Sequence, residues 1–149
     1  MHSTVSRLLD HLVPLLPLDE RAPSAHVAAV HTSVFAIPSS EDECVALAAS
    51  VYRAALQALP ASVRGWYVAL RDRGLATRLE RYTAAAHSGA IVAAELDDCA
   101  AGAEAMATEQ FSVRASRAAR EVVSALAVED GAVLEMAVRL PSTYPLKVC

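Results

Sequence analysis

The chain has little of what builds a disulfide-stapled or zinc-binding domain. Its 149 residues include only three cysteines, Cys44, Cys99 and Cys149. They are odd in number, widely spaced and form no Cys-x-x-Cys pair, which argues against a disulfide framework and against a zinc site. We therefore expect a reducing, cytosolic environment and no cofactor bound by these residues.

Membrane signals are also missing. No basic segment followed by an apolar one opens the chain, so a signal peptide is not expected. The most apolar run, from Cys44 to Leu59, is interrupted by Arg53 and Gln57 and is too short to span a bilayer. No membrane partner is expected.

No catalytic motif can be recognised. A Gly-x-Ser-x-Gly elbow, a phosphate-binding glycine loop and a His-Glu-x-x-His helix are all absent from the sequence. His26 and His31 fall in a predicted loop and are interpreted as ordinary polar loop residues. Cys44 and Cys99 lie on apolar stripes of predicted helices, where a free cysteine usually packs as a small hydrophobe. No catalytic and no metal-binding residue is therefore assigned.

Positive charge is scarce in the first 110 residues, which hold eight arginines and no lysine against thirteen acidic residues. Residues 111–149 hold five basic side chains against four acidic ones. Contacts with nucleic acid depend on Lys and Arg, because these neutralise phosphates. Any such contact is expected at the C-terminal end, while the plainer explanation of so small a difference is a solvated face on each half.

Helical periodicity fills most of residues 3–109. A first helix is predicted over 3–16, followed by a loop of about two dozen residues rich in Pro, Ser and His. So long a loop indicates either a decorated surface or that the first helix belongs to a preceding unit. The next helix, 41–59, has the clearest start, because Ser40 and Glu43 form a capping box.

Further helices are predicted over 61–73, 75–87 and 90–110, separated by breaks at Gly74 and at Ser88-Gly89. Short breaks favour antiparallel packing of neighbouring helices. Trp66 lies on an apolar stripe, so we expect it in the core.

At Phe111 the period changes from 3.6 to 2, which predicts strands over 111–116, 120–129 and 132–140. Asp130-Gly131 predicts a type I′ hairpin turn. Pro141 ends the third run, and an apolar turn follows at Tyr144-Pro145. The fold class is α+β and helix-dominated, with a helical array followed by an antiparallel β-meander. The last strand is expected to present an unpaired edge and an apolar face.

Two stretches resemble the listerin family, the RING-type E3 ubiquitin-protein ligases of ribosome-associated quality control. In the first, Leu59-Pro60 is followed by Val63-Arg64-x-Trp66 and a later acidic-aromatic pair. In the second, Phe-Ser-Val at 111–113, Arg-Glu-Val at 120–122, an acidic turn and Leu-Pro-x-x-Tyr-Pro-Leu at 140–146 stand in the family's order. The resemblance covers about residues 55–148.

The resemblance implies an assignment for each part of the chain. Residues 1–40, an N-terminal helix and loop, stay unassigned; 41–109 would be HEAT-like, the end of a helical arch; and 110–149 would be the N-terminal part of an RWD domain. The domain is expected to be truncated, lacking the rest of its sheet and its closing helix. Listerins end in a zinc-binding RING that recruits the ubiquitin-conjugating enzyme, and zinc is expected only in that absent RING.

The partners implied are a large ribosomal subunit carrying a stalled nascent chain and other components of ribosome quality control. Candidate ribosome-binding residues are Arg114, Arg120 and Lys147. Structural roles are expected for Trp66, Asp130, Gly131, Pro141, Tyr144 and Pro145.

Two alternatives remain open. The chain could be a non-catalytic helical-plus-RWD adaptor that joins proteins, as RWD folds often do. It could also be an enzyme whose Cys or His site forms only in three dimensions. The sequence therefore leaves open whether the chain is part of an enzyme.

Overall fold

The computed structural model describes residues 4–19, 40–128 and 131–148. The chain divides into two compact units, Met1–His87 and Ser88–Cys149. Each unit is described by itself below. Helices form the first unit, and a helix with a three-stranded sheet forms the second, so the expected helix-dominated α+β class is confirmed.

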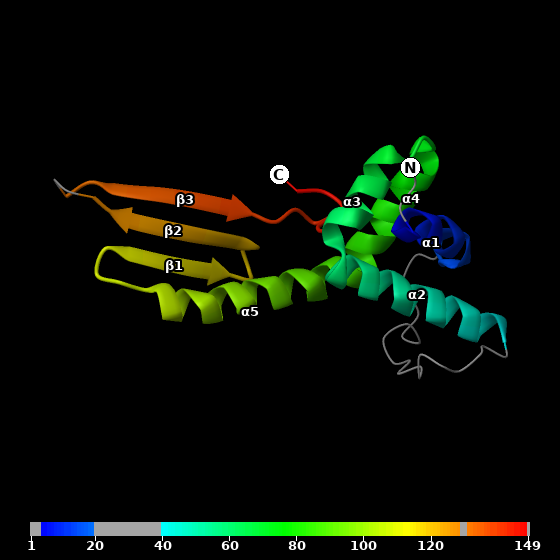
Figure 1. Cartoon of the computed structure of the whole chain (residues 1–149), viewed down its shortest axis with the longest axis horizontal. Helices are drawn as coiled ribbons and strands as arrows, with labels where there is room; N and C mark the ends of the chain where they lie inside the picture. Colours follow the sequence, from blue (N-terminus) through cyan, green and yellow to red (C-terminus); the bar gives the residue numbers. More distant parts are fainter. Residues whose placement is uncertain (1–3, 20–39, 129–130, 149) are drawn as a thin grey trace. The chain divides into compact units, whose positions relative to one another are not determined.

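In the described residues of the first unit every element is a helix (Figure 1). Its buried positions come from every one of them, as the helical apolar periodicity predicted. The elements are α1 (Thr4–Leu12), η1 (Val13–Leu15), α2 (Glu41–Ala58), α3 (Pro60–Ala69) and α4 (Arg73–Thr83).

Helix α2 begins where the capping box predicted. The Ser40 side-chain oxygen accepts a hydrogen bond from the Glu43 backbone N–H at 3.2 Å. The helix ends at Ala58, with Leu59 as its C-cap, and Pro60 opens α3. Proline suits this place because a missing N–H costs nothing at the first helical position. The two axes bend by 109° at this point, so these neighbours do not pack antiparallel as predicted.

Trp66 is buried as predicted and also ties α1 to α3. Its indole Nε1–H donates to Asp10 Oδ1 at 2.8 Å, and the two helices pack together. Leu9 of α1 is completely buried. Helix α1 therefore belongs to the first unit rather than to a preceding one, a tertiary relation that local sequence pattern could not decide.

The predicted break at Gly74 is wrong. Helix α3 ends earlier, at Ala69, and Gly74 lies in the first turn of α4. The Asp72 carboxylate caps α4 by accepting the Leu75 backbone N–H at 3.0 Å. An aspartate cap outweighs a single helical glycine, whose cost in a helix is about 1 kcal/mol.

The predicted stop at Ser88-Gly89 is also wrong. Residues Ala84–Ser88 form a π-helical turn, η3, and α5 begins directly at Gly89. Ser88 has helical backbone angles, φ −58° and ψ −39°. Thr83, His87 and Ser88 are all buried, so tertiary packing holds this turn helical against the local signal.

The second unit places α5 (Gly89–Met106) beside an antiparallel sheet in the order β1 (Phe111–Ser116), β2 (Glu121–Ala127), β3 (Val133–Arg139). Figure 1 shows α5 running along the β1 side of this sheet. Each strand pairs with the next in sequence, with Phe111 opposite Leu126 and Leu126 opposite Leu134. The predicted meander is therefore confirmed.

The β2–β3 connection differs from the predicted two-residue turn. The Val128 N–H donates to the Ala132 carbonyl at 2.9 Å, so three residues, 129–131, join the paired positions. Gly131 has φ +75°, the left-handed region that favours glycine. Asp130, the other predicted turn residue, lies outside the described residues.

Candidate functional site

The three predicted ribosome-binding side chains have different surroundings. Arg114 is exposed on β1, on the sheet face opposite the half-buried Phe111 and Val113. Lys147 is exposed after the C-terminal turn. Its cross-strand neighbour is Val123, and within the described ranges no ion pair involves Arg114. Arg114 is therefore available to bind an anion.

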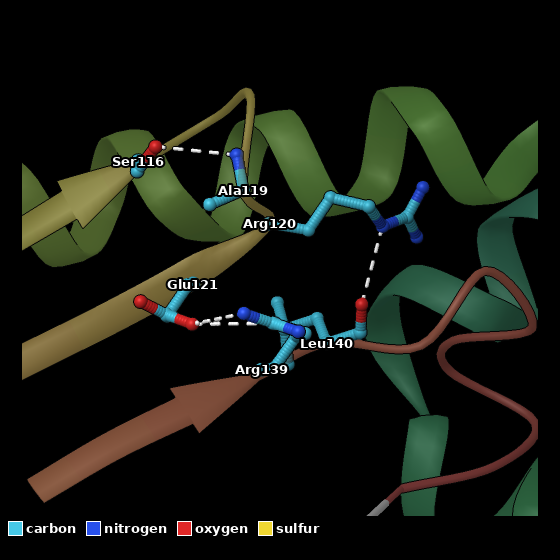
Figure 2. A network of polar contacts seen from close by, with 6 residues as sticks. All are labelled: Ser116, Ala119, Arg120, Glu121, Arg139 and Leu140. Carbon is cyan, nitrogen blue, oxygen red and sulfur yellow. Dashed lines mark hydrogen bonds and ion pairs between the residues drawn. The ribbon is translucent and has the colours of Figure 1, made fainter.

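Arg120 is a half-buried structural residue in this fold. Its guanidinium donates to the Leu140 carbonyl at 3.2 Å, to the Pro141 carbonyl at 2.7 Å and to Ser88 Oγ at 3.3 Å. Figure 2 shows the side chain reaching from the β1–β2 turn to Leu140. Through these three hydrogen bonds to protein oxygens, Arg120 holds the chain after β3 in place.

The backbone of Arg120 is unusual, with φ +54°. A non-glycine residue in this left-handed region carries a steric cost. The bonds that offset it include the Arg120 carbonyl accepting the Leu140 N–H at 2.8 Å. No local pattern in the sequence marks this position.

The predicted C-terminal turn is anchored to α5 from two sides. The Tyr144 hydroxyl donates to Glu95 Oε1 at 3.3 Å, and the Tyr144 carbonyl accepts from Ser88 Oγ at 2.6 Å. Pro145 and Leu146 are buried. Two hydrogen bonds and two buried side chains therefore hold this turn against α5.

Two groups of charged side chains in the second unit form ion pairs and are not assigned as binding sites. Arg117 binds Asp97 of α5 through two nitrogens, which raises the pKa of the guanidinium. Arg139 binds Glu121 across β2 and β3 at 2.9 Å (Figure 2). Both pairs are exposed on at least one side, so each contributes little to stability.

A pocket of about 270 Å³ opens between α5 and the sheet, and no sequence motif indicated it. Leu96 and Cys99 line it from α5, Val122 and Val138 from the sheet, and Glu95 from its rim. Cys99 is exposed, so the prediction that it packs as a buried hydrophobe is wrong. Cys44 is half-buried, and Cys149 lies outside the described residues.

This pocket does not provide a nucleophilic site. Activation of a thiol needs a neighbouring base or positive charge, and among the residues that line the pocket none is basic. An enzyme acting through Cys99 is therefore not supported by this geometry.

The first unit contains a buried ring cluster of Tyr52, Tyr82 and His87. The His87 ring meets both tyrosines edge-on, with centroid separations of 5.8 and 5.3 Å. Tyr52 Oη is hydrogen-bonded to the hydroxyl of buried Thr83 at 2.8 Å, and burial raises the pKa of Tyr52. Burial, with a smaller effect of Arg53, lowers the pKa of His87 from 6.5 to about 4.

His87 Nε2 is buried, and none of the described residues offers it a hydrogen bond. The ring is therefore neutral near pH 7, and the cluster is a packing core. His26 and His31 lie outside the described residues.

Residues 4–19, 40–128 and 131–148 contain neither a cluster of metal ligands nor a single membrane-spanning helix. No group of three or more His, Cys, Asp or Glu side chains is placed to hold a metal ion there. In the same part of the chain no single helix is long and apolar enough to cross a membrane, and only the bent pair α2 and α3 has the required length and composition.

Comparison with known proteins relates the chain to one family. Residues 2–100 match the model of the LTN1 family HEAT repeat region. The match includes the N-terminal residues that the sequence motifs left unassigned. It reaches into α5 of the second unit.

Two curated relatives also match, and in each the matched region is a small part of the whole protein. The chain is similar to the E3 ubiquitin-protein ligase listerin of Schizosaccharomyces pombe, 30% identical over 112 residues, which is 73% of this chain and 7% of the relative. It is also similar to that of Gallus gallus, 27% identical over 155 aligned positions, 96% of this chain and 9% of the relative. The chain spans less than a tenth of the length of either relative.

Proposed function

Since the chain belongs to the listerin family, we propose that it is a non-catalytic scaffold segment of a ubiquitin ligase that acts on stalled nascent chains at the large ribosomal subunit. The observation that carries the proposal is the family match over residues 2–100. The second unit would correspond to the beginning of an RWD domain. The working environment would be the cytosol.

Catalysis is not assigned to these side chains. A RING binds zinc through clustered Cys and His, and the described residues contain no such cluster. Binding of zinc and of a ubiquitin-conjugating enzyme would therefore belong to other parts of the ligase. Other quality-control components would be further partners of the whole ligase.

Arg114 and Lys147 would contact ribosomal RNA. Arg114 projects from an open sheet face and forms no ion pair within the described ranges. The third candidate, Arg120, is hydrogen-bonded within the fold. Its replacement would therefore affect ribosome binding only indirectly. Phosphate contacts of this kind weaken as salt rises, because condensed counterions are released on binding.

The test is co-sedimentation of the 149-residue chain with purified large ribosomal subunits across a salt series. Arg114→Ala should weaken binding several-fold and reduce the magnitude of the slope of log affinity against log salt by about one. Arg71→Ala, an exposed arginine of the first unit, removes the same charge elsewhere and is the matched control. Equal behaviour of the two variants, or no binding by the parent chain, would contradict the proposal.

A second candidate function is a protein-joining adaptor without ligase activity. The exposed apolar side chains of β3, Leu134 and Met136, favour it, because exposed patches of this kind mark protein interaction sites. The salt dependence of binding distinguishes the two functions. Ribosome binding through phosphates falls with salt, whereas binding through an apolar face does not.

A further inference from the structure

Six of the eight arginines in the first 110 residues lie within residues 53–81. The same stretch holds only two acids, Asp72 and Glu80, so its formal charge is +4 in a chain whose net charge is −4. Counting charge over the whole of residues 1–110 hides this concentration, because the acids of 41–43 and 95–98 flank it. The stretch that includes α3 and α4 is therefore more basic than the C-terminal end of the chain.

Both acids of this stretch are used by the fold. The Asp72 carboxylate accepts the Leu75 backbone N–H at 3.0 Å and so caps the start of α4. Glu80 accepts a hydrogen bond from the hydroxyl of Tyr67, which is buried on α3. The Glu80 carboxylate is therefore turned toward α3 and away from the solvent side of α4.

Helix α4 separates its apolar side chains from its basic ones. Its buried residues are Ala76, Leu79, Tyr82 and Thr83. With about 3.6 residues per turn, Arg73, Thr77 and Arg81 follow one another at one-turn intervals on the opposite side, and all three are exposed. We call these three residues the outer face of α4. The Thr77 hydroxyl donates to the Arg73 carbonyl at 2.9 Å, so this residue adds no charge to the face.

The two arginines of the outer face are open to an external anion. Across residues 4–19, 40–128 and 131–148, neither the Arg73 nor the Arg81 guanidinium forms an ion pair. A third arginine of α4, Arg78, binds Asp19 at 3.1 Å, and both of these side chains are substantially exposed. An ion pair of this kind is weak in water, so a phosphate can replace the carboxylate.

Helix stability does not explain the position of Arg73. It is the first residue of α4, where the free backbone N–H groups give a helix its positive end and disfavour a cation. Helix α2 shows the favourable arrangement, because its first turn holds three acids, whereas the first turn of α4 holds none. A side chain that opposes its local setting is expected where function requires it.

We propose that the outer face of α4 binds the phosphate backbone of double-stranded RNA. Arginine suits a phosphate, because its planar guanidinium can donate two parallel hydrogen bonds. This contact is separate from Arg114 and Lys147 of the second unit. Arg71 lies before the helix, next to Asp72 in the chain, and is not part of the face. The choice of RNA over DNA rests on the proposed function at the ribosome.

The composition of the outer face favours a nucleic acid over a protein as its partner. Protein interfaces depend on aromatic and apolar side chains at their centre. None of the exposed large apolar side chains in the described residues lies on α4. Packing against a neighbouring helical repeat would also need apolar side chains on this face. Phosphate contacts, in contrast, need only positive charge and hydrogen-bond donors.

The same composition indicates a duplex and not a single strand. Proteins hold single-stranded nucleic acids largely by stacking the bases on aromatic side chains. The one aromatic residue of α4, Tyr82, is buried on the other side of the helix. Double-stranded RNA is recognised mostly through its shape, its phosphates and its 2′-hydroxyl groups. We therefore expect binding that is independent of base sequence.

The experiment is a titration of a fluorescent RNA duplex of about 16 base pairs with the whole chain, followed by anisotropy across a salt series. The parent should bind the duplex more tightly than it binds either separated strand. The double variant Arg73→Gln with Arg81→Gln should weaken binding at least about tenfold and reduce the magnitude of the slope of log affinity against log salt by about two. Glutamine is a good helix former, so circular dichroism should show the folded spectrum.

The matched control is Arg7→Gln with Arg53→Gln, which removes two exposed arginines from α1 and α2 and should bind like the parent. Four results would overturn the proposal: no binding by the parent, equal loss in the two double variants, tighter binding of a single strand, or displacement of the duplex by polyglutamate at equal charge. Ribosome co-sedimentation of Arg114→Ala is a separate readout, so either proposal can fail alone.

Discussion

At the residue scale, His87 shows how burial sets a protonation state. The side chain is 4% exposed, packs between two tyrosine rings, and its pKa is lowered from 6.5 to about 4. An unfolded chain protonates this ring near pH 6.5, whereas the folded chain keeps it neutral until about pH 4. The stability that the neutral ring provides is therefore complete above pH 6.5 and is lost as the pH falls toward 4.

Replacing His87 by Phe should remove this pH dependence. The loss in the parent amounts to about 3 kcal/mol across the window, because one pKa unit corresponds to about 1.4 kcal/mol. Urea unfolding at pH 7 and pH 5 measures the part of this loss that falls between the two values, about 2 kcal/mol. The difference between parent and variant cancels the carboxylates common to both. His11→Gln removes an exposed histidine and is the control. A parent and a His87→Phe variant with parallel pH profiles would refute the assignment.

Residue-scale features divide clearly into those that sequence could indicate and those it could not. Gly131 was expected at a turn, because glycine alone adopts positive φ without steric cost. Arg120 adopts positive φ too, and its long side chain binds oxygens some twenty and thirty positions away in the chain. No neighbouring residue encodes such a bond, so a basic side chain in a charged stretch was interpreted as a surface contact.

At the element scale, helix starts were easier to predict than helix ends. The capping box at Ser40 is a local interaction between residues three apart, so the sequence contains all of it. The strands were predicted for the same reason, because alternation is local. The boundary between α3 and α4 differs from the prediction because the Asp72 cap starts α4 ahead of Gly74. The end of α4 differs because burial of Thr83, His87 and Ser88 keeps the chain helical there.

Loss of the Ser40 cap should lower the stability of the first unit measurably. Ser40→Ala leaves the Glu43 N–H without its side-chain acceptor and should cost about 1 kcal/mol in the free energy of unfolding. Ser50→Ala changes an exposed serine inside the same helix, where alanine is the better helix former, and should be neutral or slightly stabilising. Chemical denaturation followed by circular dichroism compares them. Equal destabilisation by the two changes would show that the cap contributes nothing.

At the scale of the whole molecule, net charge and exposed apolar surface act together. The net charge is −4 near pH 7, and the isoelectric point is about 5.7. At that pH repulsion between chains vanishes while the apolar side chains of β3 remain exposed. Protonation of unfolded His87 favours unfolding over the same interval.

Solubility should therefore pass through a minimum near pH 5.7. Leu134→Lys should raise solubility above pH 7 relative to the parent, because it interrupts the apolar row of β3. It also reduces net negative charge, so Ala119→Lys, an exposed loop position with the same charge change, is the control. Light scattering against pH compares the three chains. A gain shared equally by both variants would assign the effect to charge alone.

Lysine is the amino acid that ubiquitin ligases modify, and this chain has a single one, Lys147. It is exposed, one residue beyond Leu146, which is buried and anchored after the Tyr144 turn. Arginine supplies every other positive side chain, and a guanidinium keeps its charge without offering an amine. Any modification directed at a side-chain amine of these 149 residues therefore has one target, next to a buried residue of the fold.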